Sequence, residues 1–179
     1  MLPVELRWVL LDRDGVINRD SDQYIRAPQE WQPLPGALQA LEQLTAAGCR
    51  LAVVTNQSGV ARGYLSAATL ARIHARLFSA VAAAGGRIEA IFYCPHAPGS
   101  GCDCRKPAPG LLHRAMRFLR ADAAGSVMIG DSQRDIDAAR RCGVAAIGVG
   151  ARPGAFGEDV MVAADLRQAV SQLLRRGAR

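Results

Sequence analysis

The chain has 179 residues, of which 50% are hydrophobic and 21% are charged, and its formal net charge is +6 at pH 7. This length and composition predict one globular domain, residues 1–179, with a hydrophobic core of its own. The apolar runs are no longer than strands, whereas a membrane span needs about 20 apolar residues, and the N-terminus lacks a signal-peptide layout. We therefore expect a cytoplasmic protein with no membrane partner. The basic residues are scattered without interleaved aromatic residues, so the charge does not by itself indicate a nucleic-acid partner.

Apolar residues alternate along the chain between short strand-like runs and the spacing of amphipathic helices. In chain order they predict strand 7–12, helix 36–48, strand 50–55, helix 66–85, strand 88–93, helix 110–120, strand 126–130, helix 135–143, strand 145–150 and helix 165–176. Such alternation favours right-handed crossovers and a parallel sheet covered on both faces. The sequence therefore predicts an α/β fold with a Rossmann-like, doubly wound parallel sheet. No large insertion follows the first or third strand, which leaves room for a minimal cap only.

Polar side chains stand where four of the expected strands end. Asp12 and Asp14 follow the first strand, and Thr55 ends the second. Lys106 comes after the loop that follows the third strand, and Asp131 follows the fourth. Each residue alone is typical of a turn, a helix cap or a solvated side chain, but ligands of parallel sheets bind at this edge. Carboxylates gathered there repel one another unless a cation separates them, and a lysine among them indicates an anion. Together they predict a site for phosphoryl transfer.

The loop after the third strand concentrates cysteine and histidine in the pattern C-x-H-x5-C-x-C. Its members are Cys94, His96, Cys102 and Cys104. Three thiolates and an imidazole suit a closed tetrahedral Zn²⁺ site, although the spacing alone also allows a coincidence of cysteines in one loop. A disulfide is disfavoured in the cytoplasm, and the lack of a C-x-x-C pair argues against redox catalysis. The remaining cysteines and histidines are expected to be structural: Cys49, Cys142, His74 and His113.

Four segments, "LLDRDGVIN", "VVTNQSGVARG", "CDCRKPAPG" and "MIGDSQRDIDAA", resemble the four motifs of haloacid-dehalogenase-type phosphatases. The resemblance covers nearly the whole chain. The pairing of "TNQSGVARG" with "CPH" and "CDCRKP" is similar to the heptose bisphosphate phosphatases and the related histidinol phosphatases. It implies catalytic Mg²⁺, structural Zn²⁺ and a loop that the zinc staples. The five-residue gap between His96 and Cys102 is shorter than in some relatives, so the loop would form less of the substrate wall.

The resemblance also implies a role for each residue of the site. Asp12 would be the nucleophile and Asp14 the general acid and base, while Lys106 would offset negative charge. The Mg²⁺ ligands would be Asp12, Asp131 and the backbone carbonyl of Asp14. The Zn²⁺ ligands would be Cys94, His96, Cys102 and Cys104. Phosphate or substrate would be bound by Lys106, Thr55, Asn56, Gln57, Ser58, Arg105, Asp20 and Tyr24.

The narrower resemblance implies a small phosphorylated sugar as the substrate. The reaction of that group removes the 7-phosphate of D-glycero-D-manno-heptose 1,7-bisphosphate, for nucleotide-heptose and hence lipopolysaccharide core or another surface glycan. Arg105 would then recognise the second phosphate, and we expect a monomer. Two alternatives stay open: a histidinol-phosphate phosphatase, and a zinc-stapled nucleic-acid-binding module. The second leaves Asp12, Asp14 and Asp131 unexplained.

Overall fold

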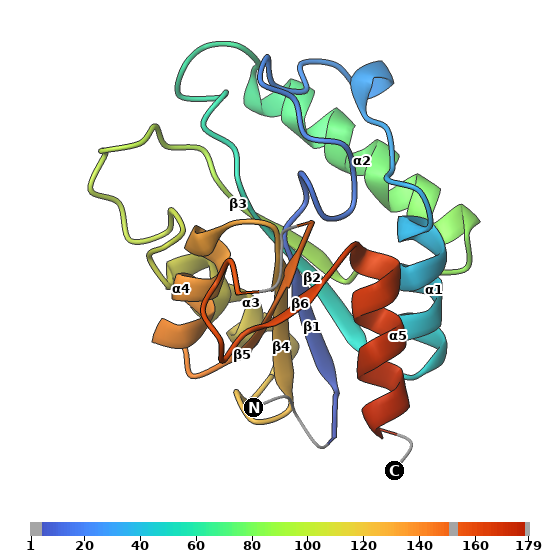
Figure 1. The fold of residues 1–179 in the computed structure, drawn as a ribbon. Helices are drawn as coiled ribbons and strands as arrows, with labels where there is room; N and C mark the ends of the chain where they lie inside the picture. The colour runs from blue at the N-terminus through green and yellow to red at the C-terminus, as the bar shows by residue number, and fades with distance from the viewer. Residues whose placement is uncertain (1–4, 151–153, 178–179) are drawn as a thin grey trace.

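The computed structural model describes residues 5–150 and 154–177 and shows a six-stranded sheet (Figure 1). The strands are β1 (Trp8–Leu11), β2 (Arg50–Asn56), β3 (Ala90–Cys94), β4 (Ser126–Gly130), β5 (Ala145–Val149) and β6 (Met161–Ala163). Their order is β3-β2-β1-β4-β5-β6, and every neighbouring pair is parallel. The chain winds outward from β1 in both directions, which confirms the doubly wound α/β fold. The point where the direction changes lies between β1 and β4, the place where such sheets bind ligands.

Helices cover both faces of the sheet (Figure 1). They are α1 (Ala37–Ala46), α2 (Ala67–Ala83), α3 (Gly110–Leu119), α4 (Gln133–Arg141) and α5 (Leu166–Gly177), with a short 3₁₀ helix at Pro28–Glu30. In β1, Val9 and Leu11 belong to the core on the α1, α2 and α5 side, whereas Leu10 belongs to the core on the α3 and α4 side. Because strands buried on both faces need apolar residues throughout, they read as continuous hydrophobic runs.

The expected strands and helices are all present, with bounds shifted by up to two residues, and the described residues also form a 3₁₀ helix and a sixth strand. Helix α4 begins at Gln133, two residues before the expected 135–143, because Ser132 and Asp135 form a capping box. Strand β6 was not expected; its three residues are too few for a periodic pattern. Among the described residues, none of the helices combines the length and the hydrophobicity needed to cross a bilayer.

Candidate active site

The carboxyl end of β1 delivers the first two carboxylates. The Asp12 amide donates to Ile129 O of β4 at 2.9 Å, which continues the parallel pairing one residue beyond the strand. The chain then turns at Gly15, whose φ is +75°. A Cβ at Gly15 would collide with the Asp131 carboxylate, so this position requires glycine for conformation and for space. The tight turn therefore sets Asp12, Asp14 and Asp131 around one point.

Lys106 is a buried cation among these acids. Its side chain is 1% exposed, and its Nζ lies 3.0 Å from Asp12 Oδ1 and 2.6 Å from Asp135 Oδ1. Nζ also donates to Val54 O at 2.7 Å. Burial alone would lower the pKa of Lys106, but Asp12 and Asp135 outweigh it and raise the pKa. Lys106 therefore stays charged beside Asp12.

Asp135 is a site residue that was not predicted, because in the sequence it is only the first residue of an expected helix. Its side chain is completely buried. Oδ2 accepts hydrogen bonds from the amide and hydroxyl of Ser132, at 3.1 and 2.7 Å, while Oδ1 is paired with Lys106 but accepts no hydrogen bond with regular geometry. The available signal was the spacing Ser132-x-x-Asp135, a capping box at the strand end that carries Asp131.

Three carboxylates form a candidate metal centre. One oxygen from each of Asp12, Asp131 and Asp135 lies within 4.8 Å of the other two. Burial raises the pKa of Asp12, Lys106 opposes this effect, and Asp135 and Asp14 add to it, which brings the pKa to about 7. Burial, Asp135 and Asp20 likewise raise the pKa of Asp131, to about 6. The raised pKa values show that these crowded carboxylates repel one another when ionised, and a divalent cation between them would remove this repulsion. Carboxylate oxygens are also the ligands that a hard cation prefers, so these residues fit Mg²⁺.

Asp14 is held by three donor residues from two segments, the turn after β1 and the end of β2. Arg13 donates from Nε at 3.1 Å and from Nη2 at 2.9 Å, Asn18 donates at 2.9 Å, and Gln57 donates at 2.8 Å. Arg13 itself is 1% exposed and lies 3.3 Å from Nε2 of His74 in α2. Burial and Arg13 lower the pKa of His74 to about 4, so this imidazole is neutral near pH 7. Arg13 was also missed from the sequence, because a charged residue between two acids is typical of an exposed turn.

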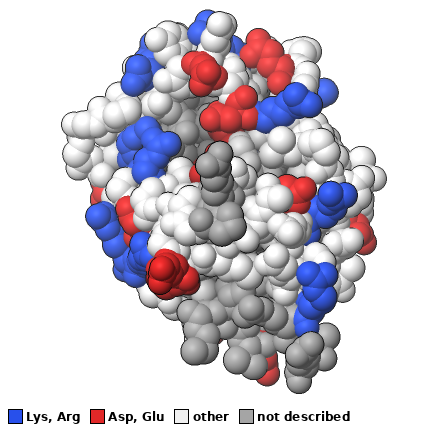
Figure 2. Space-filling model, viewed as in Figure 1, with Lys and Arg blue, Asp and Glu red and all other residues white. Residues whose placement is uncertain are grey.

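Among the residues that the structure describes, three adjoining hollows lie at this edge of the sheet. We name each hollow by what borders it. The catalytic hollow has a volume of about 140 Å³ and is lined by Asp12, Asp14, Asp20, Thr55, Asn56, Lys106, Asp131, Ser132, Arg134 and Asp135. The outer hollow, of about 330 Å³, borders the segment after β1. The loop hollow, of about 310 Å³, borders the Cys/His loop. Acidic and basic side chains border a hollow in the upper half of this view (Figure 2).

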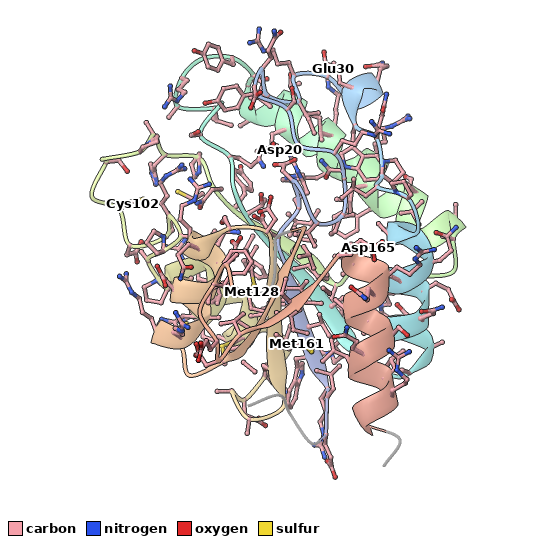
Figure 3. All side chains as sticks on the ribbon, in the orientation of Figure 1. Asp20, Glu30, Cys102, Met128, Met161 and Asp165 are labelled. Carbon is pink, nitrogen blue, oxygen red and sulfur yellow. The ribbon has the colours of Figure 1, made fainter. Side chains whose placement is uncertain are left out.

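All eight residues predicted to bind phosphate or substrate line these hollows. Thr55 lines the catalytic hollow, and Lys106 lines the catalytic and loop hollows. Arg105 lines the outer and loop hollows but not the catalytic one. The outer hollow also collects Asp20, Tyr24, Asn56, Gln57 and Ser58. Figure 3 shows Asp20 above the carboxyl end of the sheet.

Asn56 has a further task that the sequence did not reveal. Its amide nitrogen donates to Lys106 O and its amide oxygen accepts from the Lys106 amide, both at 3.1 Å. This reciprocal pair ties the backbone of Lys106 to the end of β2. It helps to fix where the buried ammonium group lies.

The four residues of the Cys/His loop converge as expected (Figure 3 labels Cys102). The Sγ atom of Cys102 lies 3.7 Å from Cys94 Sγ and 3.6 Å from Cys104 Sγ. The Nδ1 atom of His96 lies 3.5 Å from Cys94 Sγ and 3.3 Å from Cys104 Sγ. A disulfide bond is about 2.05 Å long, so these thiols are unbonded to one another. Tetrahedral ligands about 2.3 Å from a zinc ion would be about 3.8 Å apart, and the cluster is close to that spacing.

Comparison with known proteins agrees with this geometry. Residues 5–143 match the family model of the haloacid dehalogenase-like hydrolases, and the chain belongs to this family. The sequence is 49% identical over 148 residues to a D-glycero-β-D-manno-heptose-1,7-bisphosphate 7-phosphatase of Pseudomonas putida, covering 83% of this chain and 81% of that protein. It is 44% identical over 177 residues to the protein of the same description from Bordetella bronchiseptica, covering 95% and 99% of the two chains.

Solved structures of proteins with the same kind of name resemble this chain in fold as well as in sequence. A crystal structure of D,D-heptose 1,7-bisphosphate phosphatase from B. bronchiseptica, complexed with magnesium and phosphate, superposes with a TM-score of 0.89 at 43% identity, covering 95% of this chain and 99% of that one. A second, from Burkholderia thailandensis, has a TM-score of 0.72 at 34% identity, covering 94% and 98%. The family and the narrower group suggested by the motifs are therefore confirmed. The chain is an enzyme, a hydrolase of the phosphatase type.

Proposed function

We propose that the chain is a Mg²⁺-dependent phosphatase that removes the 7-phosphate of D-glycero-D-manno-heptose 1,7-bisphosphate through an aspartyl-phosphate. The observation that carries the proposal is the buried Lys106, 3.0 Å from Asp12 Oδ1 in a hollow that further carboxylates line. A lysine so placed offsets the repulsion between an anionic nucleophile and an anionic substrate. At about 4 Å and an effective dielectric of about 20, this attraction is about 4 kcal/mol.

Asp12 is the nucleophile of this proposal. Its Oδ1 accepts from the Arg13 amide at 2.7 Å and faces Lys106, which leaves Oδ2 to attack phosphorus. As the Asp12–phosphorus bond forms, the bond from phosphorus to the sugar oxygen breaks, and Asp14 gives that oxygen a proton. A water molecule then attacks the phosphoryl group, Asp14 takes its proton, and Asp12 is released. Asp12, Asp131, Asp135 and the backbone carbonyl of Asp14 would hold Mg²⁺, which would supply positive charge for the phosphoryl oxygens when bound.

Thr55 and the hollows beyond it address the rest of the substrate. The Thr55 hydroxyl lines the catalytic hollow and is 3.0 Å from Gln57 Nε2, which donates to it and leaves its proton for a phosphate oxygen. Arg105 donates to His96 O at 3.2 Å, so the Cys/His loop anchors its guanidinium at the outer and loop hollows. From there we assign Arg105 to the second phosphate, which it can bind through a planar fork.

The loop itself is proposed to be a closed zinc site with a structural task. Cys94, His96, Cys102 and Cys104 provide four protein ligands, which leaves no position for substrate. Arg105 and Lys106 follow the last ligand directly, so the metal would fix the segment that carries both cations. We further propose that the enzyme works as a cytoplasmic monomer in nucleotide-heptose synthesis, binding neither nucleic acid nor a membrane.

A matched set of kcat/KM values tests the proposal. The compounds are both C1 anomers of heptose 1,7-bisphosphate, heptose 7-phosphate and histidinol phosphate, with ³¹P NMR to identify the phosphate that remains. We expect heptose 1-phosphate as the product and at least about a tenfold preference for the bisphosphate, the effect of one charge-assisted contact. Arg105→Ala should reduce that preference while affecting monophosphates much less. A preference for histidinol phosphate, or loss of the 1-phosphate, would contradict the assignment.

A further inference from the structure

Arg134 lies where the three hollows meet. It comes from the first turn of α4, its side chain is exposed, and it lines the catalytic, outer and loop hollows. Arg105 shares the outer and loop hollows with it. Arg134 is the residue common to the linings of all three hollows, so a substrate with its reacting phosphate beside Asp12 can reach either larger hollow alongside this side chain.

The guanidinium of Arg134 is available to a ligand. Arg13, Arg50 and Arg140 each pair with a carboxylate. The Arg134 side chain, by contrast, forms neither an ion pair nor a hydrogen bond with any residue in the described part of the chain, although Asp135 adjoins it in sequence. An unpaired arginine at the rim of an anion-binding hollow has its full set of donors free for phosphate oxygens.

The position of Arg134 is also unfavourable for the helix that carries it. The first turn of a helix presents unpaired amides and a partial positive charge, which favours acidic residues and disfavours basic ones. Asp135, in the same turn, follows this rule, and Arg134 breaks it. A residue that opposes local stability without a compensating contact is expected where function requires it.

We propose that Arg134 is a specificity-determining residue that binds the second phosphate of the substrate together with Arg105. The inference rests on the proposed function, since it assigns a further residue to the distal end of the same bisphosphate. Lys106 offsets the charge of the reacting phosphate, while Arg105 and Arg134 approach the distal phosphate from the Cys/His loop and from α4. Two planar forks can share its oxygens.

The experiment compares wild type with Arg134→Ala, Arg134→Lys and Arg117→Ala. Arg117 is an exposed residue of α3 that lines none of the three hollows, so its removal makes the same change in net charge at a distance from them. We expect Arg134→Ala to lower kcat/KM for heptose 1,7-bisphosphate at least about tenfold, as for loss of one charge-assisted contact. The loss on heptose 7-phosphate should be less than about threefold, Arg134→Lys should be intermediate, and Arg117→Ala should match wild type.

Two further readouts separate binding from a structural role. Inhibition by heptose 1-phosphate should weaken about tenfold in Arg134→Ala, whereas inhibition by inorganic phosphate, which can occupy the reacting position, should not change. The Tm of Arg134→Ala should stay the same or rise by about 1–3 °C, because a cation leaves the helix N-terminus. In the variant that lacks both Arg105 and Arg134, the losses should be non-additive if both bind one phosphate.

The outcomes distinguish this inference from the proposed function. A wild type without preference for the bisphosphate overturns the proposed function. A wild-type preference that Arg134→Ala retains in full overturns the inference alone. Equal losses on the bisphosphate and on heptose 7-phosphate also overturn it, because they place Arg134 at the reacting phosphate.

Discussion

Asp135→Asn removes a charge from the most deeply buried ion pair of the site. Loss of one partner from a buried pair costs about 3–5 kcal/mol. Lys106 keeps Asp12 and Val54 O as neighbours, so we expect the lower end, about 3 kcal/mol. For a chain of this length each kcal/mol lowers Tm by about 2–4 °C, which predicts a decrease of about 6–12 °C. The Mg²⁺ affinity should also fall, by about 10- to 100-fold, since one carboxylate of the centre is neutralised.

Thermal unfolding without metal, followed by titration of activity with Mg²⁺, measures both effects. In Asp135→Asn, the asparagine side chain keeps an oxygen that can accept from Ser132. Asp135→Ala also loses this cap, so its Tm should be about 2–4 °C lower than that of Asp135→Asn, which corresponds to about 1 kcal/mol of unfolding free energy. Asp137→Asn is the matched control on the same helix, because Asp137 is only partly buried and pairs with Gln133 and Arg140 at the surface. Its effect should stay within about 0.5 kcal/mol. If the Tm of Asp135→Asn lies within about 2 °C of the wild-type value, the loss of unfolding free energy is at most about 1 kcal/mol, and Asp135 is not the counter-ion of Lys106.

Three other variants probe separate parts of the account. Asp12→Asn should fold normally, as judged by circular dichroism, and its kcat should fall by many orders of magnitude. If the variant keeps a tenth of the wild-type kcat, a rise of only about 1.4 kcal/mol in the activation free energy, Asp12 is not the nucleophile. Elemental analysis should find about one zinc per chain, and Cys102→Ser should lower zinc content and Tm together, whereas full activity in zinc-free protein would contradict the stapled loop. His74 has a pKa of about 4 in the folded protein and about 6.5 in the unfolded chain. Keeping His74 neutral therefore contributes about 3 kcal/mol to the free energy of unfolding above pH 6.5, and this contribution is lost as the pH falls toward 4. Urea unfolding of His74→Gln should therefore depend less steeply on pH in this window, and identical slopes would show that His74 is not buried as a neutral base.

The parts of the site that follow strands were predictable from the sequence. A buried apolar run identifies a strand, parallel strands end at one edge, and Asp12, Thr55 and Asp131 therefore had to meet there. The Cys/His cluster was predictable because its four residues lie within one loop. In both cases local pattern and simple topology place the side chains.

The residues that were missed owe their positions to packing between distant segments. Arg13 is buried because His74, 61 residues away, lies against its guanidinium. Asp135 reads as an ordinary acidic residue in a helix's first turn, and only the phase of α4 aims it at Lys106. The edge strand β6 is recognisable only beside β5, because three residues carry no period. These contacts depend on tertiary structure, which hydrophobic periodicity does not encode.

The central claim, that Asp12 carries the phosphoryl group, can be tested by trapping it. Enzyme quenched during turnover of heptose 1,7-bisphosphate is reduced with borohydride, which converts an aspartyl-phosphate to homoserine, and is then digested with trypsin. Cleavage after Arg7 and Arg13 releases the peptide WVLLDR, in which Asp12 is the sole carboxylate side chain, while Asp14 falls in the next peptide, DGVINR. We predict homoserine in WVLLDR, dependent on substrate and Mg²⁺, and no change in DGVINR. Homoserine in DGVINR would contradict this claim. So would enzyme quenched at full turnover in which WVLLDR is unmodified and a residue of another peptide has been reduced.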